Sequence, residues 1–596
     1  MYRFESHDRA GVGNASPGAA TYAERARQLS LPFTATIRLG ATGRVTAAAI
    51  RRGTFAMSED GTAYIAPEER ELPAIQAWLT AYPAARDRLW LTTPHAIREA
   101  LTARAAPQLL ANAVNRLATR HPEFSARRTL TRAQATIGGA AVAAIVAGAV
   151  LAPRDVAIAI NLVAACLFLA VSTLRFVAAG TLRPLRQVHA SAPSNEADLP
   201  VYTVLAPLHR EAALADDIVR ALLNVDWPRD KLDVKLLVEA CDPATIAAAR
   251  RATQGTPFEV VVVPAGSPRT KPRALAYALP LARGTFVTVF DAEDRPHRLQ
   301  LRRAWETFRN APADLGCVQA ALLIDNEDDS WLARLFAIEY AALFDGLLPA
   351  LAALKIPVPL GGTSNHFRLS VLNEVGGWDC YNVTEDADIG IRLARFGYRT
   401  VIIDLPTLEE APTNARIWFR QRTRWFKGWM QTFLVHTRQP LRLVRELGAA
   451  GALGFMLMSV GIVLSAMVYP VYLATVVLAL LNPLDVWANG NTFHAAAVGI
   501  YFFNLAGGHA AMALLALRAL RRRGRTGLTG GIWLLPVYWL FMSLAAYWAV
   551  AELAFRPHYW AKTPHCRYRG RTIARHRRRS AGAAARQGQA LPVPGG

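Results

Sequence analysis

The feature that most constrains this chain is a pair of long uncharged segments set close together. Residues 135–153 and residues 156–174 each run for 19 residues without a charged side chain. About 20 apolar residues cross the hydrocarbon core of a bilayer as a helix, so the pair predicts a transmembrane hairpin within residues 135–179. Arginines flank the hairpin on both sides, and these place both of its ends in the cytoplasm: Arg127, Arg128 and Arg132 before it, Arg175, Arg183 and Arg186 after it.

Composition and charge narrow the class of protein further. Of 596 residues, 52% are hydrophobic and 19% are charged, which excludes a disordered or collagen-like chain. The net charge is +22, and after Glu552 the chain carries Lys562 and nine arginines but no acidic residue. A basic tail (residues 556–596) beside apolar segments predicts membrane lipids, not nucleic acid, as partners. The polar, charged start of the chain predicts no signal peptide and a cytoplasmic N-terminal region.

The C-terminal half predicts further transmembrane helices within residues 447–555. Residues 451–484 are uncharged and form either one long tilted span or two short spans that turn at Pro470. Residues 486–517 contain another span, near 493–517, and residues 527–551 contain the last, giving five or six spans in total. The arginines within residues 518–525 and the basic tail both favour the cytoplasm. A single apolar segment separates these two basic stretches, so both cannot face the cytoplasm if that segment crosses the membrane. Either one of the two stretches is misplaced or the last segment is re-entrant.

Residues 1–130 predict a small cytoplasmic α/β domain. Strand-like runs at residues 33–39 and 45–50 alternate with helical stretches near 70–81 and 94–104. No Gly-Lys-Ser/Thr sequence occurs in the chain, so we expect no phosphate-binding loop of that type. The expected role of this region is regulation or docking.

Residues 199–440 predict a larger α/β domain between the membrane segments. Apolar strand-like runs lie at 201–206, 234–238, 258–263 and 285–290, with helix-compatible stretches between them. Strands that alternate with helices predict a parallel sheet. Such sheets bind ligands outside the carboxyl ends of their strands, so the residues that follow each strand are the candidates.

Acidic residues follow two of these strands. Glu239 and Asp242 come after the second, and Asp291, Glu293 and Asp294 come after the fourth. Carboxylates packed this closely repel each other unless a hard cation lies among them, and Mg²⁺ or Mn²⁺ takes such oxygen ligands. The alternative is an ordinary solvated acidic turn.

A third acidic cluster comprises Glu385, Asp386 and Asp388. It opens a helical stretch with Thr384 in position to be the N-cap, so it is either an ordinary helix start or the location of a general base.

Gln421, Arg424 and Trp425 share one face of a later helix. An arginine can bind phosphate oxygens and an indole can support a sugar ring. The alternative is an interfacial helix with its aromatic side chains facing lipid.

The order of these motifs over residues 199–440 resembles the membrane-bound processive glycosyltransferases of family 2, the cellulose, hyaluronan and chitin synthase type. The stretches that begin at Lys271 and Gly361 are also similar to that family. Residues 1–130 resemble the N-terminal domain of type II secretion ATPases. The resemblance implies an α/β GT-A (Rossmann-like) domain, a nucleotide-diphosphate sugar donor such as a UDP-sugar, Mg²⁺ or Mn²⁺, and inversion at the anomeric carbon.

The same resemblance implies a role for each candidate residue. Asp386 would be the general base beside Glu385; Glu239, Asp242, Lys271 and Asp291 would bind the donor; Asp291 and Glu293 would hold the metal; Gln421, Arg424 and Trp425 would bind the acceptor and the diphosphate. The metal motif is Asp-Ala-Glu instead of the usual Asp-x-Asp, so either Glu293 reaches further or Asp294 replaces it. The first acidic motif leaves open whether Glu239 or Asp242 contacts the nucleotide base of the donor.

Three functions remain open at this point. The first is a multi-pass enzyme of the inner or plasma membrane, with a cytoplasmic catalytic domain, that extends and exports a β-linked polysaccharide. The N-terminal domain would then meet an export or regulatory partner. The second is a single-transfer enzyme acting on a membrane lipid. The third is a catalytically silent membrane scaffold, against which the intact acidic clusters argue.

Overall fold

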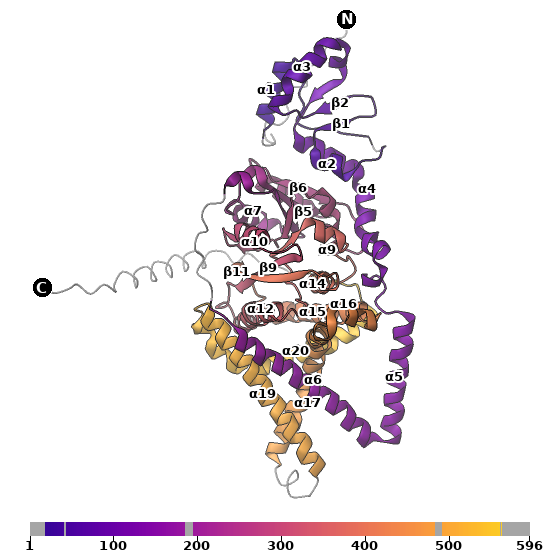
Figure 1. Ribbon diagram of the computed structural model, residues 1–596, viewed down its shortest axis with the longest axis vertical. Helices are drawn as coiled ribbons and strands as arrows, with labels where there is room; N and C mark the ends of the chain where they lie inside the picture. Colours follow the sequence, from indigo (N-terminus) through magenta and orange to yellow (C-terminus); the bar gives the residue numbers. More distant parts are fainter. Residues whose placement is uncertain (1–17, 41–42, 185–194, 483–491, 561, 563–596) are drawn as a thin grey trace, which may run out of the picture.

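The computed structural model describes residues 18–40, 43–184, 195–482, 492–560 and 562. These residues form three zones along the long axis of the molecule (Figure 1). A small N-terminal lobe lies at one end, a central α/β domain follows, and long helices extend to the other end.

An eight-stranded mixed sheet forms the centre of the α/β domain. Its strand order is β6-β5-β4-β7-β10-β9-β11-β8. The strands are β4 (Tyr202–Leu208), β5 (Leu232–Glu239), β6 (Glu259–Val263), β7 (Phe286–Val289), β8 (Arg295–Pro296), β9 (Leu315–Ile324), β10 (Asn365–Arg368) and β11 (Arg399–Glu409). The four predicted strands match β4 to β7, which pair in parallel, whereas β10 runs antiparallel to both of its neighbours. The predicted α/β fold class is confirmed, with a mixed instead of a purely parallel sheet.

Helices cover both faces of this sheet, and this packing accounts for its apolar strands. One face packs against α7 (Ala215–Leu223), α8 (Pro243–Ala252) and α10 (Gln300–Arg309). The other face packs against α9 (Lys271–Ala278), α13 (Leu369–Glu374) and α14 (Glu385–Arg395). The helices α11 (Trp331–Tyr340), α12 (Leu348–Ala353) and α15 (Ala415–His436) lie between the sheet and the long helices (Figure 1).

The N-terminal lobe is α/β as predicted, but its strands lie elsewhere. The elements of the lobe are α1 (Ala19–Leu29), α2 (Ala47–Arg52), β1 (Phe55–Met57), β2 (Ala63–Ile65), α3 (Leu72–Ala81) and β3 (Leu89–Leu91). The predicted strand at 45–50 is wrong because Thr46 caps an alanine-rich turn that Gly53 ends in a left-handed conformation. The predicted strand at 33–39 is also wrong, since only Phe33 bridges to β3.

Helix α4 (Pro94–Arg120) joins the lobe to the α/β domain and extends well past the predicted 94–104. Its buried face, which includes Leu101 and Leu109, belongs to the same apolar core as strands β4 to β7. Arg98 also donates to Glu259 at 2.6 Å, and Glu259 accepts from the buried Lys235 at 2.8 Å. Helix α4 is therefore structurally a part of the α/β domain.

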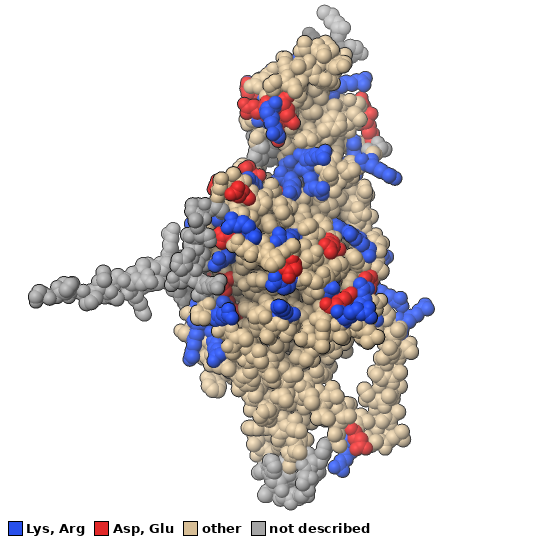
Figure 2. Space-filling model, in the orientation of Figure 1, with Lys and Arg blue, Asp and Glu red and all other residues tan. Residues whose placement is uncertain are grey.

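The long helices form a zone with few charged residues. Figure 2 shows that lysine, arginine, aspartate and glutamate gather over the α/β domain and the lobe, while the far zone is almost free of them. The helices are α5 (Arg132–Leu151), α6 (Pro153–Thr181), α16 (Pro440–Met456), α17 (Ile462–Leu481), α19 (Thr492–Arg522) and α20 (Leu535–Phe555). Helix α6 alone is about 43 Å long, enough to cross a bilayer. The chain is a membrane protein.

Six helical segments of the described residues are long and apolar enough to cross a membrane, in line with the predicted five or six. The α16–α17 segment continues through Pro470, so the turn considered there is wrong. One of the six, Trp331–Ala353, was not anticipated, and it is mostly buried within the protein. Residues 486–491 of the next predicted span lie outside the described residues.

Both ends of α20 lie against the α/β domain. Before it, Arg522 donates to Asp404 of β11 at 2.8 Å, and Arg525 pairs with Glu327 at 2.8 Å. After it, Lys562 pairs with Glu211, which follows β4, at 2.9 Å. A helix whose two flanks meet the same domain does not carry the chain across a bilayer, so this geometry supports the re-entrant alternative.

The re-entrant geometry predicts which positions share a side of the membrane. In a cysteine-free background, an impermeant maleimide should label Gly527→Cys and Arg556→Cys from the same side of sealed vesicles. Asp155→Cys, at the far tip of the α5–α6 hairpin, should react from the opposite side. Labelling of positions 527 and 556 from opposite sides would show that α20 crosses the bilayer.

The packing of α4 predicts where the chain can be shortened. A chain that begins at Thr92 should remain monodisperse with a thermal transition close to that of the full chain. A chain that begins at Arg127 should aggregate, because each large apolar side chain of α4 contributes about 1.5–3 kcal/mol by burial. Size-exclusion chromatography and thermal unfolding of both truncations test this, and equal stability of the two would contradict it.

Candidate active site

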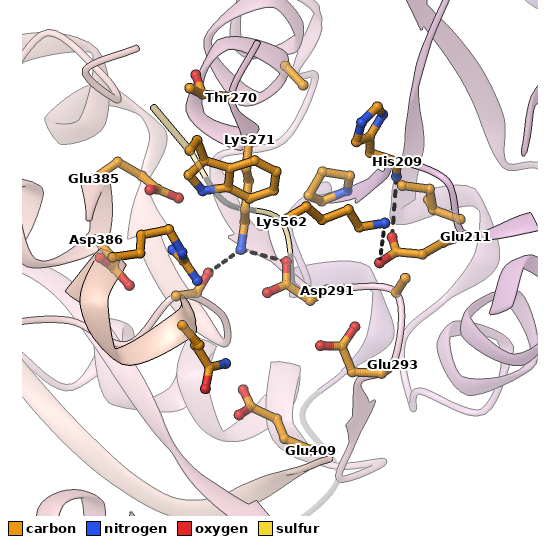
Figure 3. Close-up of a pocket in the computed structure, with 18 of the residues that line it drawn as sticks. His209, Glu211, Thr270, Lys271, Asp291, Glu293, Glu385, Asp386, Glu409 and Lys562 are labelled. Carbon is orange, nitrogen blue, oxygen red and sulfur yellow. Dashed lines mark hydrogen bonds and ion pairs between the residues drawn. The ribbon is translucent and has the colours of Figure 1, made fainter. Parts of the chain in front are cut away.

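A cavity of about 170 Å³ opens at the carboxyl ends of the central strands. Nine of the ten residues predicted from the sequence line it: Glu239, Lys271, Asp291, Glu293, Glu385, Asp386, Gln421, Arg424 and Trp425. Figure 3 shows many of them pointing into one space. The strand-end argument therefore located the cavity, although the individual roles stay predictions.

Lys271 lies at the centre of this cavity (Figure 3). It begins α9, and its Nζ lies 2.5 Å from Asp291 and donates to the Gly362 carbonyl at 2.7 Å. Burial alone would lower the pKa of Lys271, but the charges of Asp291 and Glu385 raise it above its ordinary value. Lys271 is thus a permanent cation between two groups of acids.

The first group of acids follows β7 and β11. Burial and the neighbouring Asp291 raise the pKa of Glu293 to about 8. Burial and Glu293 likewise raise the pKa of Glu409 well above its usual range. Burial and like charges both disfavour the charged forms of these carboxylates, and a divalent cation would stabilise those forms.

The donor set in this group suits Mg²⁺ or Mn²⁺ because it consists of carboxylate oxygens. Among the residues that the structure describes, no group of three side chains forms a closed metal site. An open site of one or two carboxylates is what such a cation uses when a diphosphate supplies further oxygens. Asp294 is buried, accepts from the Asp291 amide at 2.6 Å and bonds to Thr363, so Glu293 and not Asp294 faces the cavity.

The two acids of the first acidic motif, Glu239 and Asp242, lie in different surroundings. Glu239 lines the cavity and its Oε2 lies 2.5 Å from the buried Arg273. Asp242 is the N-cap of α8, accepting from the Thr245 amide at 3.2 Å, and also accepts from the Arg210 amide at 2.5 Å. Asp242 does not line the cavity, so its donor-binding role stays a prediction while its local role is to cap a helix.

The second group of acids opens α14. Burial, together with Asp386, raises the pKa of Glu385 to about 8, and burial also raises the pKa of Asp386. Thr384 occupies the predicted N-cap position without a side-chain capping bond. A Cβ at Gly428 of α15 would collide with Thr384, so this glycine allows the two helices to approach closely. Because of this close approach, α15 packs beside the start of α14, where Glu385 and Asp386 lie.

Helix α15 supplies the three predicted acceptor residues. Gln421 Oε1 and Arg424 Nε are buried without a hydrogen-bond partner among the described residues, and both side chains line the cavity. Trp425 stacks on Tyr340 with ring centroids 6.3 Å apart and an interplanar angle of 27°. Buried polar atoms without partners indicate a site that a ligand completes.

A second cavity, of about 240 Å³, lies beyond the first on the side of the long helices. Tyr340, Gly362, Asp386 and Trp425 line both cavities. The first cavity is rich in charged groups, whereas the second is bounded mainly by leucine, methionine and aromatic side chains. Asp386 therefore lies where a polar space meets an apolar one, and Glu385 lines only the polar space.

Several lining residues escaped the sequence prediction. His209 and Glu211 follow β4, so the strand-end rule would have found them. Glu409 ends β11 and Glu410 follows it, but no strand was predicted there. Trp560 and Lys562 lie in the segment assigned to a lipid-binding tail. Trp560 instead stacks on Arg424, whose guanidinium carbon is 5.6 Å from the ring centroid. No local pattern in the sequence signals that contact.

Comparison with known proteins agrees with this site. Residues 286–489 match the family model "Glycosyl transferase family group 2". The chain is 25% identical over 259 residues to the probable glycosyltransferase YdaM of Bacillus subtilis (strain 168). It is 28% identical over 243 residues to the beta-monoglucosyldiacylglycerol synthase of Synechocystis sp. (strain ATCC 27184 / PCC 6803 / Kazusa). These matches cover 42% and 40% of this chain, and 60% and 50% of the two relatives.

Among solved structures, the mannosyltransferase PcManGT from Pyrobaculum calidifontis, in complex with GDP-Man and Mn²⁺, is 20% identical. The match covers 67% of this chain and 98% of that one, but its TM-score of 0.41 is too low to support an argument. The family model, with the named glycosyltransferases and the strand-end site, carries the assignment. Residues 286–489 are therefore similar to the glycosyltransferases of family group 2.

Proposed function

We propose that this protein transfers a sugar from a nucleotide-diphosphate donor, such as a UDP-sugar, to a hydroxyl group that reaches the site from the membrane side. The observation that carries the proposal is the position of Asp386 at the junction of the polar and apolar cavities. The charged cavity suits a diphosphate, and the apolar cavity suits an acceptor that enters from the long helices.

The residues of the cavity fit an inverting transfer. Asp386 takes the proton of the acceptor hydroxyl as the acceptor oxygen bonds to the anomeric carbon of the sugar. The bond between that carbon and the diphosphate breaks, and the nucleoside diphosphate leaves. Lys271 and Arg424 stabilise the negative charge that develops on the leaving group, and Trp425 supports the acceptor.

Asp291 and Glu293 would hold a divalent cation, Mg²⁺ or Mn²⁺, against the diphosphate. Such a cation would neutralise charge on the leaving group. The raised pKa of Glu293, about 8, supports this assignment because burial and Asp291 both disfavour its charged form, which a cation would stabilise.

The acceptor is better matched by a lipid than by a growing polysaccharide. A sugar chain in transit needs polar partners along its path, whereas the second cavity is bounded by side chains such as Leu347, Met458 and Leu515. One relative of this chain is named a beta-monoglucosyldiacylglycerol synthase, which agrees with a lipid acceptor. The stacked pair of Trp425 and Tyr340 is the observation that favours the polysaccharide alternative.

A cytosolic donor requires the α/β domain to face the cytoplasm. The start of α5, the end of α6 and the end of α19 lie on the side of this domain (Figure 1). Arg132, Arg183 and Arg522 lie at or next to those ends, in agreement with the positive-inside rule. We therefore propose a multi-pass protein of the inner or plasma membrane. A partner for the N-terminal lobe, regulatory or exporting, stays a prediction.

Replacement of Asp386 tests the proposed base. Membranes that contain the full chain should transfer label from one of a panel of radiolabelled UDP-sugars, and Asp386→Asn should lower that rate by about 10²–10⁴-fold. UDP binding should stay within about tenfold, because a base acts on the acceptor. Glu385→Gln is the matched variant and should lower the rate less. A larger loss in Glu385→Gln would move the base to Glu385.

The solubility and the size of the labelled product identify the acceptor. With a lipid acceptor, the labelled product should partition into organic solvent at a single size. Water-soluble or insoluble material of increasing length would establish the polysaccharide alternative instead.

The pKa of Glu293 predicts a pH-dependent metal affinity. Below about pH 8 its carboxyl is mainly protonated, and a cation must displace that proton to bind. Mn²⁺ affinity, measured by electron paramagnetic resonance, should therefore fall as the pH falls, approaching about tenfold per unit. Glu293→Gln should bind more weakly and lose this dependence. A wild-type affinity that is constant from about pH 6 to about pH 8 would contradict the metal role.

A further inference from the structure

Two arginines lie in the lining of the mainly apolar second cavity, and one of them, Arg422, is paired with Glu339. Arg175 belongs to α6, within the zone of long helices, and its guanidinium carbon is 5.6 Å from the ring centroid of Trp539. A cation among apolar side chains is costly unless it has a partner, and such residues usually mark a binding site.

The protein does not supply that partner among the residues the structure describes. No hydrogen bond or ion pair there reaches the Arg175 guanidinium. Glu339, whose charge acts on it, is already engaged: Arg422 binds both of its oxygens at 2.7 and 2.6 Å, and Tyr538 donates to it at 2.7 Å. Arg175 thus keeps donors that face the cavity.

A nearby arginine, in contrast, has a hydrogen-bond partner within the protein. Arg518 of α19, which packs along α6, donates to the Ala179 carbonyl at 2.5 Å. Its charge is satisfied by the backbone of the same helix that carries Arg175. Arg175 makes no such contact within the described chain, so a bound group is the better account of its donors.

We propose, on the basis of the transfer proposed above, that the second cavity binds an anionic glycerophospholipid with a free head-group hydroxyl, and that this lipid is the acceptor. Arg175 binds its phosphate, because a guanidinium offers paired donors to phosphate oxygens. The apolar walls, including Leu347, Met512 and Met542, enclose part of an acyl chain. The hydroxyl reaches Asp386 at the junction, where its oxygen bonds to the anomeric carbon, its proton passes to Asp386 and the nucleoside diphosphate leaves.

The test separates lipid binding from transfer. The full chain is reconstituted in vesicles of phosphatidylcholine or of an equimolar mixture with phosphatidylglycerol. The labelled lipid retained after detergent extraction is measured without donor, and release of UDP from UDP-sugars is measured separately. Wild type should retain phosphatidylglycerol in preference to phosphatidylcholine. Arg175→Gln should lower that preference about tenfold, the loss expected for one charge-assisted bond.

Matched variants keep the result interpretable. Arg183→Gln changes an exposed arginine just beyond the same helix and should behave as wild type. Arg175→Lys should keep part of the preference because it keeps the charge. Met542→Phe should reduce retention of both lipids by filling the cavity, and it decides the matter if Arg175→Gln does not fold.

Each outcome bears on one proposal. Equal retention of the two lipids by wild type, or an undiminished preference in Arg175→Gln, overturns the lipid site even if UDP-sugar turnover is present. Full retention of both lipids by Met542→Phe also overturns it. A preference that depends on Arg175, without any turnover of the UDP-sugar panel, supports the lipid site and contradicts the proposed transfer.

Discussion

The buried ion pair between Arg422 and Glu339 holds the polar and apolar parts of this protein together. Arg422 belongs to α15, the helix that carries the acceptor residues, and Glu339 belongs to α11 beneath the sheet. Tyr538 of α20 bonds to both partners. Removing one member of such a pair costs about 3–5 kcal/mol because the other charge is left buried. Three helices are therefore fixed where the polar cavity meets the apolar one.

The active-site cavity depends on a balance of charge that the protein leaves incomplete. Lys271 compensates Asp291 and lies close enough to Glu385 to act on it. Burial first, and neighbouring carboxylates second, raise the pKa values of Glu293 and Glu409, so the charge of Lys271 does not offset both effects on one side. On the other side, Arg424 offers an unpartnered donor. A metal–diphosphate unit, with a cation at one end and phosphate oxygens at the other, would complete both sides at once.

The sequence predicted which residues come together around this cavity because strand ends and helix faces are local patterns. Asp291 and Glu293 directly follow an apolar strand, and Gln421 and Trp425 share a helix face by spacing alone. The failures have a different physical origin. Residues 45–50 formed a helix because capping by Thr46 outweighed their β-like pattern. Trp560 reached Arg424 through tertiary packing, which no local pattern contains.

The re-entrant course of α20 resolves a conflict that charge alone could not. Arginines on both sides of one apolar segment cannot both face the cytoplasm if that segment crosses the bilayer. They can if the segment does not cross, and the ion pairs of Arg525 and Lys562 with the same domain favour that course. The return also brings Trp560 over Arg424. The contacts that hold both flanks of α20 on this domain thus also bring Trp560 and Lys562 into the wall of the cavity.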